Sequence, residues 1–148
     1  MALAPQKFRE IVFQLLYSRN FEKSDWESAV SLVMRENAVP KSTVRQAQEK
    51  VEAICHVLDK IDELISSISL EYAFDRITRI EQTLLRLGMY ELLHTDVPPK
   101  VVIAEAVRLA RKFSTAEGAS FVNALLDAVY KTSTEQEHET LSTESIPV

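Results

Sequence analysis

The sequence predicts an all-α protein, and three observations support this. The 148 residues include only two glycines and five prolines, with ample Leu, Ala, Glu and Arg, which favours helix over sheet. Apolar residues recur at spacings of three and four along most of the chain, as they do on one face of a helix. Capping boxes, in which Ser or Thr is followed by Glu three positions later, precede several of these stretches. A chain of this length holds one core, so we expect one compact bundle of about six or seven helices.

The N-terminal half contains three predicted helices. The first covers residues 5–20, and a capping box of Ser24 and Glu27 starts the second. Residues 37–40, which contain Asn and Pro, end the second helix. The third begins near Ser42 and is expected to be one long helix, because its apolar residues alternate at spacings of three and four. They are Val44, Ala47, Val51, Ile54, Leu58, Ile61, Ile65 and Ile68.

The C-terminal half begins with an ambiguous segment, residues 69–78, which holds at most one short helical turn around 72–76. A capping box of Thr78 and Glu81 then starts the fourth helix. Gly88 lies in its middle, where glycine costs about 1 kcal/mol relative to alanine. We therefore expect Gly88 to permit the close approach of a neighbouring helix.

A double proline, Pro98 and Pro99, separates the fourth helix from the fifth, since proline ends one helix but is tolerated at the start of the next. Ser114 and Glu117 form a further capping box, which is expected to start the sixth helix. Phe121 lies near the edge of the buried arc of that helix. The inward stripe of the helix is Val122, Leu125, Leu126 and Val129.

The charge of the chain is unevenly distributed. The last segment, residues 132–148, contains four glutamates and no Lys or Arg, and is expected to be a disordered acidic tail after a folded domain of residues 1–131. The whole chain has a net charge of −5, and the part without the tail is nearly neutral. Within that part, residues 1–23 and residues 98–113 are basic. Two basic segments on a neutral body suit phosphate binding, although solvated helix faces are the alternative.

Residues with catalytic or ligating chemistry do not cluster in the sequence. The three histidines lie on separate segments, and the glycines are too far apart for a phosphate-binding loop. The single cysteine, Cys55, has apolar neighbours and is expected to be a buried thiol in a reducing compartment. No apolar run approaches the roughly 20 residues that span a bilayer. We therefore expect a cytoplasmic protein that is not an enzyme, binds no metal or cofactor and has no membrane partner.

Two residues of the sixth helix have alternative interpretations. Phe121 either packs beneath a loop or offers its ring to an unstacked base, a contact worth about 1–3 kcal/mol. Asn123 is polar on a largely apolar helix, and either caps a neighbouring element or contacts a ligand.

The chain resembles the NusB family of bacterial transcription antitermination proteins. The resemblance rests on five blocks, which span most of the predicted domain in the order and spacing of the family. They are Arg9-Glu10 with QLLY at 14–17, EQTLLRLGMYEL at 81–92, DVPPKVVIAEA at 96–106, ARKF at 110–113 and FVNALLD at 121–127. Residues 24–70 match only as a helical pattern.

The resemblance implies a fold of two packed helical subdomains and a role in transcription. It implies binding of boxA sequences in single-stranded RNA, together with a small-subunit ribosomal protein that acts as NusE, in a complex that keeps RNA polymerase processive on ribosomal RNA operons. The residues implied to bind RNA are Gln6, Lys7, Arg9, Ser120 and Phe121. The residues implied to bind NusE are Tyr17 and Glu81.

The first helix departs from the family pattern. Relatives begin with a run of arginines, whereas this chain reads APQKFR at residues 4–9. Because each lost phosphate contact weakens binding and flattens its salt dependence, we expect low RNA affinity in the isolated protein, with the ribosomal partner supplying charge. Two alternatives are a protein-interaction adaptor or homodimer with weak RNA binding, and an RNA-binding domain related to ribosomal RNA cytosine methyltransferases.

Overall fold

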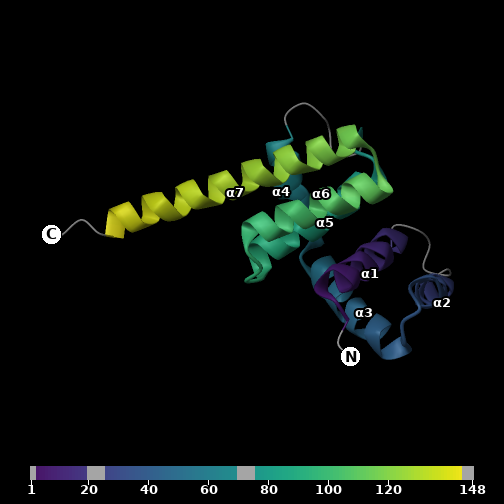
Figure 1. Cartoon of the computed structure of the whole chain (residues 1–148). Coiled ribbons are helices and arrows are strands. Elements are labelled where there is room, and N and C mark those ends of the chain that lie inside the picture. The colour runs from purple at the N-terminus through teal and green to yellow at the C-terminus, as the bar shows by residue number, and fades with distance from the viewer. Residues whose placement is uncertain (1–2, 20–25, 70–75, 145–148) are drawn as a thin grey trace.

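The computed structural model describes residues 3–19, 26–69 and 76–144, with residues 133–144 described as backbone only. Within these ranges the chain forms seven α-helices and no strand (Figure 1), which confirms the predicted all-α class. The helices are α1 (Pro5–Ser18), α2 (Trp26–Asn37), α3 (Lys41–His56), α4 (Leu58–Ile68), α5 (Arg79–His94), α6 (Pro99–Phe113) and α7 (Ala116–Glu144).

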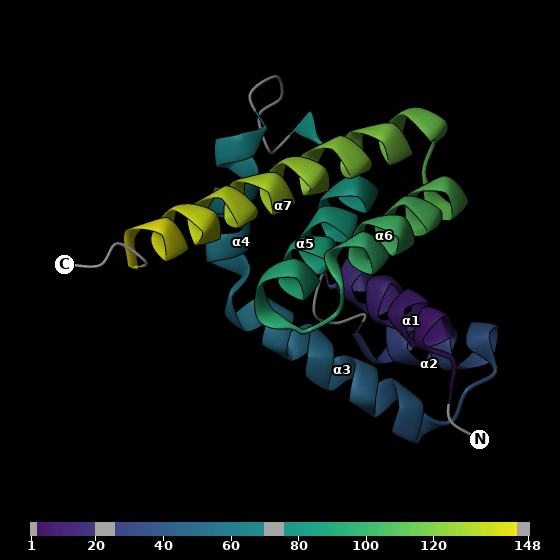
Figure 2. The same cartoon turned by 60° about the vertical axis from the view of Figure 1, so that its left-hand side comes forward.

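The helices form two groups that pack against each other. In the first group α1, α2 and α3 contact one another, and in the second α5, α6 and α7 do so, with α4 packed on α5 and α7. The contact of α1 with α5 joins the groups. Both views place α6 between α7 and α1 (Figures 1 and 2), so α6 is the middle layer of the region where the predicted RNA-binding residues lie.

The core is apolar and continuous across the two groups. Ile11 and Leu15 of α1, Leu84 and Leu85 of α5, and Leu126 of α7 are all essentially inaccessible to solvent. The predicted role of Gly88 is confirmed, because a Cβ atom at this position would lie 2.8 Å from Cδ1 of Leu126. Glycine at this point lets α5 and α7 approach more closely than any other residue would allow.

The predicted single helix over residues 42–68 is wrong in one respect. The apolar stripe faces the core as expected, but the chain breaks into α3 and α4 at Val57, where φ is −113° and ψ is 16°. The Val57 N–H donates to the carbonyl of Ile54, a tighter bond than that of an α-helix. The two helices can therefore pack against different partners: α3 packs mainly on α1, whereas α4 packs on α5 and α7.

The helix caps agree with the predictions at α5 and differ at α7. Thr78 is the N-cap of α5, and its side chain accepts a hydrogen bond from the Glu81 N–H. At α7 the cap is Thr115 rather than Ser114: its hydroxyl accepts from the Gly118 N–H at 2.9 Å. Ser114 instead donates to the carboxylate of Glu81 at 3.4 Å, which ties the α6–α7 turn to the start of α5.

The backbone of α7 continues to Glu144, through most of the segment for which the sequence predicts a disordered acidic tail. No glycine or proline occurs between Ala119 and Ile146, so nothing in the sequence stops the helix before Pro147. The first helix ends at Ser18, slightly earlier than expected. The predicted capping residue Ser24 and the predicted turn at 72–76, apart from Arg76, lie outside the described residues.

Candidate nucleic-acid interface

Arg9 of α1 lies in a buried cluster of charges rather than on the surface. Its Nε and Nη2 atoms donate to the two carboxylate oxygens of Glu91 on α5, each at 2.9 Å. Its Nη1 atom donates to Glu105 on α6 at 3.0 Å. The three side chains are 11%, 1% and 8% exposed, respectively. One guanidinium therefore joins three helices at once.

The cluster continues along the boundary between α1 and α6. Glu10 of α1 accepts from Nζ of Lys112 at 2.7 Å and lies 3.6 Å from Nη1 of Arg108. Arg108 also donates to Glu105 at 2.6 Å and to the main-chain carbonyl of Gln6 at 3.4 Å. The ion-pair network, as we call it here, consists of six residues: Arg9, Glu10, Glu91, Glu105, Arg108 and Lys112.

Within the ion-pair network, the neighbouring charges favour the ionised forms of Arg9 and Glu10. The hydrogen bonds from Arg9 to Glu91 raise the pKa of Arg9, and the charges of Glu91 and Glu105 add to this against the opposing effect of burial. Burial pushes the pKa of Glu10 upward, but the hydrogen bond and charge of Lys112, with the charges of Lys7 and Arg108, outweigh it. The net result is a pKa of Glu10 below its ordinary value.

This arrangement argues against the prediction that Arg9 contacts RNA. Every guanidinium nitrogen of Arg9 donates to a carboxylate, and the side chain is almost entirely covered. A swing toward solvent would leave Glu91 and Glu105 charged, buried and without this partner. The pairing cannot be predicted from the sequence, because Glu91 and Glu105 lie 82 and 96 residues from Arg9 along the chain.

The other predicted RNA-binding residues have accessible surface. Gln6 and Ser120 are exposed, and Lys7 and Phe121 are half-buried. Phe121 packs against the core with part of its ring, as its place at the edge of the buried arc predicted. Gln6 and Lys7 belong to α1, Ser120 and Phe121 belong to α7, and α6 lies between these two helices (Figure 2).

Helix α6 itself carries two exposed cations outside the ion-pair network. Lys100 and Arg111 are both exposed and are separated by three helical turns, so they lie on one face of α6. Both belong to the basic segment 98–113 of the sequence, but neither is among the predicted site residues. The surface formed by Gln6, Lys7, Lys100, Arg111, Ser120 and Phe121 is called the α1–α6–α7 face below.

The two predicted partner-binding residues, Tyr17 and Glu81, are linked by a series of contacts between α1, α6 and α5. The ring of Tyr17 lies 6.3 Å from that of Phe13, which in turn lies 5.1 Å from the ring of Phe113 at the end of α6. The next residue, Ser114, donates to Glu81. Contacts from α1 through the end of α6 thus connect Tyr17 with the start of α5.

Glu81 is held in place on three sides. It accepts a hydrogen bond from the Thr78 hydroxyl at 2.8 Å and the longer one from Ser114. It also lies directly over Gly118, where a Cβ atom would be 2.3 Å from Oε1 of Glu81. Glu81 is half-buried as a residue, and its carboxylate is oriented by these contacts, as hydrogen bonding to a partner requires.

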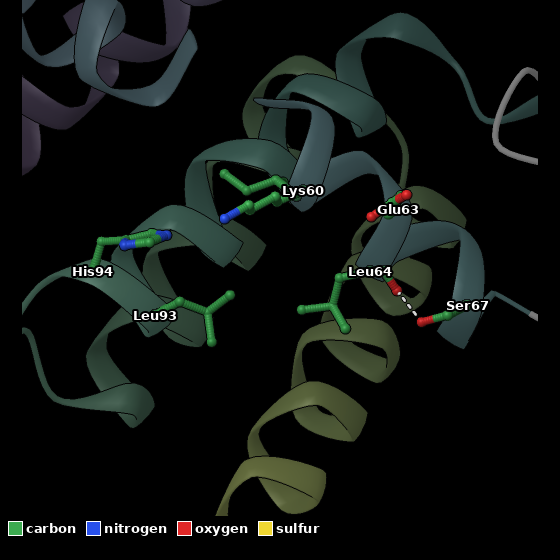
Figure 3. Close-up of a pocket in the computed structure, with 7 residues that line it drawn as sticks. Lys60, Glu63, Leu64, Ser67, Leu93 and His94 are labelled. Carbon is green, nitrogen blue, oxygen red and sulfur yellow. Dashed lines mark hydrogen bonds between the residues drawn. The ribbon is translucent and has the colours of Figure 1, made fainter. Parts of the chain in front are cut away.

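An open pocket of about 520 Å³ lies elsewhere, between α4 and the end of α5 (Figure 3). Ile61, Leu64 and Leu93 provide its apolar surface, and Leu93 is 42% exposed. The remaining lining residues are Lys60, Glu63, Ser67 and His94. The Ser67 hydroxyl donates to the carbonyl of Leu64 within its own helix.

In the described part of the chain, no helix combines the length and apolar character needed to cross a membrane. In the same residues no three His, Cys, Asp or Glu side chains are grouped so that they could hold a metal ion. Burial raises the pKa of the half-buried Cys55 thiol, which favours its neutral form.

Comparison with solved structures finds the same fold in proteins of the antitermination machinery. NusB from T. maritima superposes with a TM-score of 0.76 at 30% identity, covering 88% of this chain and 93% of that chain. A structure of the antitermination factors NusB and NusE in complex with double-stranded RNA matches with a TM-score of 0.72 at 26% identity. That match covers 86% of this chain and 96% of that chain.

Sequence comparison gives the same result. The transcription antitermination protein NusB of Desulfovibrio desulfuricans is 40% identical over 134 residues, covering 83% of this chain and 82% of the relative. The NusB protein of Fervidobacterium nodosum is 33% identical over 125 residues, covering 83% and 87%. The family model for NusB matches residues 6–131, which are almost all of the predicted folded domain. The chain therefore belongs to the NusB family.

Proposed function

We propose that this protein is a transcription antitermination factor that binds boxA-type RNA together with the small-subunit ribosomal protein acting as NusE. The observation that carries the proposal is the match, over 86% of the chain, to a NusB protein in complex with NusE and RNA. Curated relatives with the antitermination name match over a similar share. The protein would act in the cytoplasm, within the antitermination complex of RNA polymerase on ribosomal RNA operons.

The α1–α6–α7 face is the proposed RNA-binding surface. Lys7, Lys100 and Arg111 would meet phosphates, and the exposed part of the Phe121 ring would stack on an unpaired base. Gln6 and Ser120 add hydrogen-bonding groups at the two sides. Cations with an aromatic platform suit single-stranded RNA, whose bases present both faces and edges.

The proposed NusE-binding surface includes Tyr17 and Glu81. It lies where α1, α5 and the α6–α7 turn meet, and Glu81 is oriented there by Thr78 and Ser114. The two surfaces use different residues, so variants of each can be measured separately.

The ion-pair network explains why we expect the isolated protein to bind RNA weakly. Arg9, Arg108 and Lys112 would supply positive charge near the proposed RNA face, but Glu10, Glu91 and Glu105 neutralise them. Three of the cations in the two basic segments are thus paired with carboxylates in the fold. Partner binding would supply the missing positive charge.

Titration of labelled boxA RNA by fluorescence anisotropy, with and without the ribosomal partner and at two salt concentrations, tests the proposal. We expect weak binding with a shallow salt dependence for the protein alone and tight binding with the partner. A duplex of the same sequence serves as competitor and separates single-stranded from double-stranded recognition. Tight binding by the protein alone with a steep salt slope would contradict the expected role of the partner.

The neutralised charge also favours a second candidate, a protein-interaction adaptor or homodimer with little RNA binding. In that case no boxA binding appears with or without the partner, Glu81→Lys still abolishes partner capture, and Phe121→Ala has no effect on either. Light scattering at several concentrations separates a monomer from a homodimer.

A further inference from the structure

We propose that Arg9 is a positioning residue: it contacts no RNA phosphate, and it fixes the first turns of α1 against α5 and α6 so that Gln6 and Lys7 are presented correctly. The RNA-binding part of this inference rests on the function proposed above. The part that concerns the position of α1 does not.

The start of α1 lacks the usual local support. Its N-cap is Ala4, whose side chain provides no capping hydrogen bond, and no acidic residue occurs in the first turn. Helix ends without caps leave several N–H groups without protein partners and open readily. Pro5 at the first helical position fixes the backbone there but ties it to nothing else.

The ion-pair network supplies the missing support from other helices. Arg9 binds Glu91 on α5 through two parallel hydrogen bonds, a geometry that fixes direction as well as distance. Arg108 of α6 donates to the main-chain carbonyl of Gln6, within the first turn itself. These contacts hold the segment that contains Gln6 and Lys7 at a defined place beside α6.

Arg9 cannot both hold α1 in place and bind an RNA phosphate. Glu91 is 1% exposed and both of its carboxylate oxygens accept from Arg9, so movement of Arg9 to an RNA phosphate would leave this carboxylate buried without its partner. Lys7, two residues earlier, points away from Arg9 because neighbours at this spacing lie on opposite sides of a helix. The roles are therefore divided: Lys7 is available to RNA, whereas Arg9 is committed to the fold.

A matched pair of variants, Arg9→Met and Lys7→Met, separates the two roles, because each replaces one cation with the same unbranched apolar side chain. Amide hydrogen exchange in α1 is measured without RNA, and boxA affinity is measured with the partner present across several salt concentrations. Arg9→Met should speed exchange in the first turns of α1 by roughly tenfold or more, with Lys7→Met leaving it unchanged. Lys7→Met should lower the salt slope by about 0.7, whereas Arg9→Met should weaken binding without changing the slope.

A rescue experiment decides between positioning and direct contact. The double variant Arg9→Met/Glu91→Met removes the unpaired carboxylate together with the arginine, and Glu105 keeps its bond to Arg108. It should recover slow exchange in α1 and boxA affinity to within about threefold of the original protein. If it recovers slow exchange but stays weak with a reduced salt slope, Arg9 contacts RNA and the inference fails.

The experiments still test the role of Arg9 if one variant does not fold or if no RNA binding is measured. If Arg9→Met does not fold, Glu105→Gln leaves the Arg9–Glu91 pair in place and should produce a smaller increase in exchange at the same residues. If the original protein binds no RNA under any condition, the proposed function fails and the exchange measurements still test positioning. Unchanged exchange in α1 of a folded Arg9→Met variant would overturn the inference.

Discussion

Arg9 on α1 and Glu91 on α5 form a bidentate ion pair, in which Nε and Nη2 of Arg9 each donate at 2.9 Å to a carboxylate oxygen of Glu91. The pair joins the two groups of helices at a point where both side chains are shielded from water. Charge–charge contacts of this kind are costly to break from one side only, because the remaining charge stays buried.

Loss of Arg9 alone should therefore destabilise the protein strongly. We predict that Arg9→Met lowers the free energy of unfolding by about 3–5 kcal/mol, as expected for a buried pair that loses one partner. Lys131→Met is the control, because Lys131 pairs with Asp127 on the exposed side of α7 and should cost less than about 1 kcal/mol. Urea unfolding followed by circular dichroism measures both, and equal effects would contradict the prediction.

The free energy of unfolding should fall in acid partly because the Glu10 carboxylate becomes protonated. The pKa of Glu10 is lowered in the folded protein from its usual value near 4.5, so the unfolded chain takes up a proton first as the pH falls. The stabilisation is present above that pH and is lost as the pH drops through the lower, folded-state pKa. Urea unfolding between about pH 3 and 7 should show a shallower decline for Glu10→Gln than for the original protein. The exposed Glu49→Gln should follow the original curve.

Gly88 should tolerate no side chain while Leu126 keeps its place. A Cβ atom at Gly88 would lie 2.8 Å from one methyl group of Leu126 and 3.1 Å from the other. Overpacking of this kind destabilises the folded protein by about 1–3 kcal/mol, and the better helix propensity of alanine offsets about 1 kcal/mol of that loss. We predict a net loss of about 1–2 kcal/mol for Gly88→Ala. The double variant with Leu126→Ala should cost less than the sum of its two single changes, and strict additivity would show that the two residues do not interfere.

Gly118 should matter for partner binding through Glu81. A Cβ atom here would lie 2.3 Å from Oε1 of Glu81 and 2.6 Å from Oγ of Ser114, so the Glu81 side chain must move. We predict that Gly118→Ala weakens NusE binding by roughly tenfold, about 1.4 kcal/mol. Its stability should change little, because alanine is the better helix former.

Isothermal titration calorimetry with the partner measures the effect of Gly118→Ala, and a Glu81→Ala background provides the control. If Gly118→Ala acts by displacing Glu81, adding it to Glu81→Ala should change the affinity no further. An equal loss in both backgrounds would mean that Gly118 acts by another route.

The periodic parts of the fold could be predicted from the sequence because their physics is local. The stripes of the helices, the Thr78 cap and the close approach at Gly88 follow from spacing and residue type. The break at Val57 could not be foreseen, since His56, Val57 and Leu58 include neither glycine nor proline. That break follows from tertiary packing, as α3 and α4 have different neighbours.

The candidate site was harder to predict for the same reason. A helix position occupied by arginine looks solvent-exposed in the sequence, and only the folded chain brings Glu91 and Glu105 to Arg9. The choice between Ser114 and Thr115 as cap also depended on a distant residue, because Glu81 accepts the Ser114 hydroxyl. Phe121, by contrast, lies at the edge of the core as its helical position predicted.

The most direct test of the proposed function is the boxA affinity of Phe121→Ala in the presence of the ribosomal partner. If the exposed part of the ring stacks on a base, truncation should cost about 1–3 kcal/mol, or roughly a 5- to 150-fold loss of affinity, with the salt slope unchanged. NusE binding should be retained, because Tyr17 and Glu81 are untouched. An affinity for boxA equal to that of the original protein, with the partner still bound, would contradict the assignment of the α1–α6–α7 face as the RNA-binding surface.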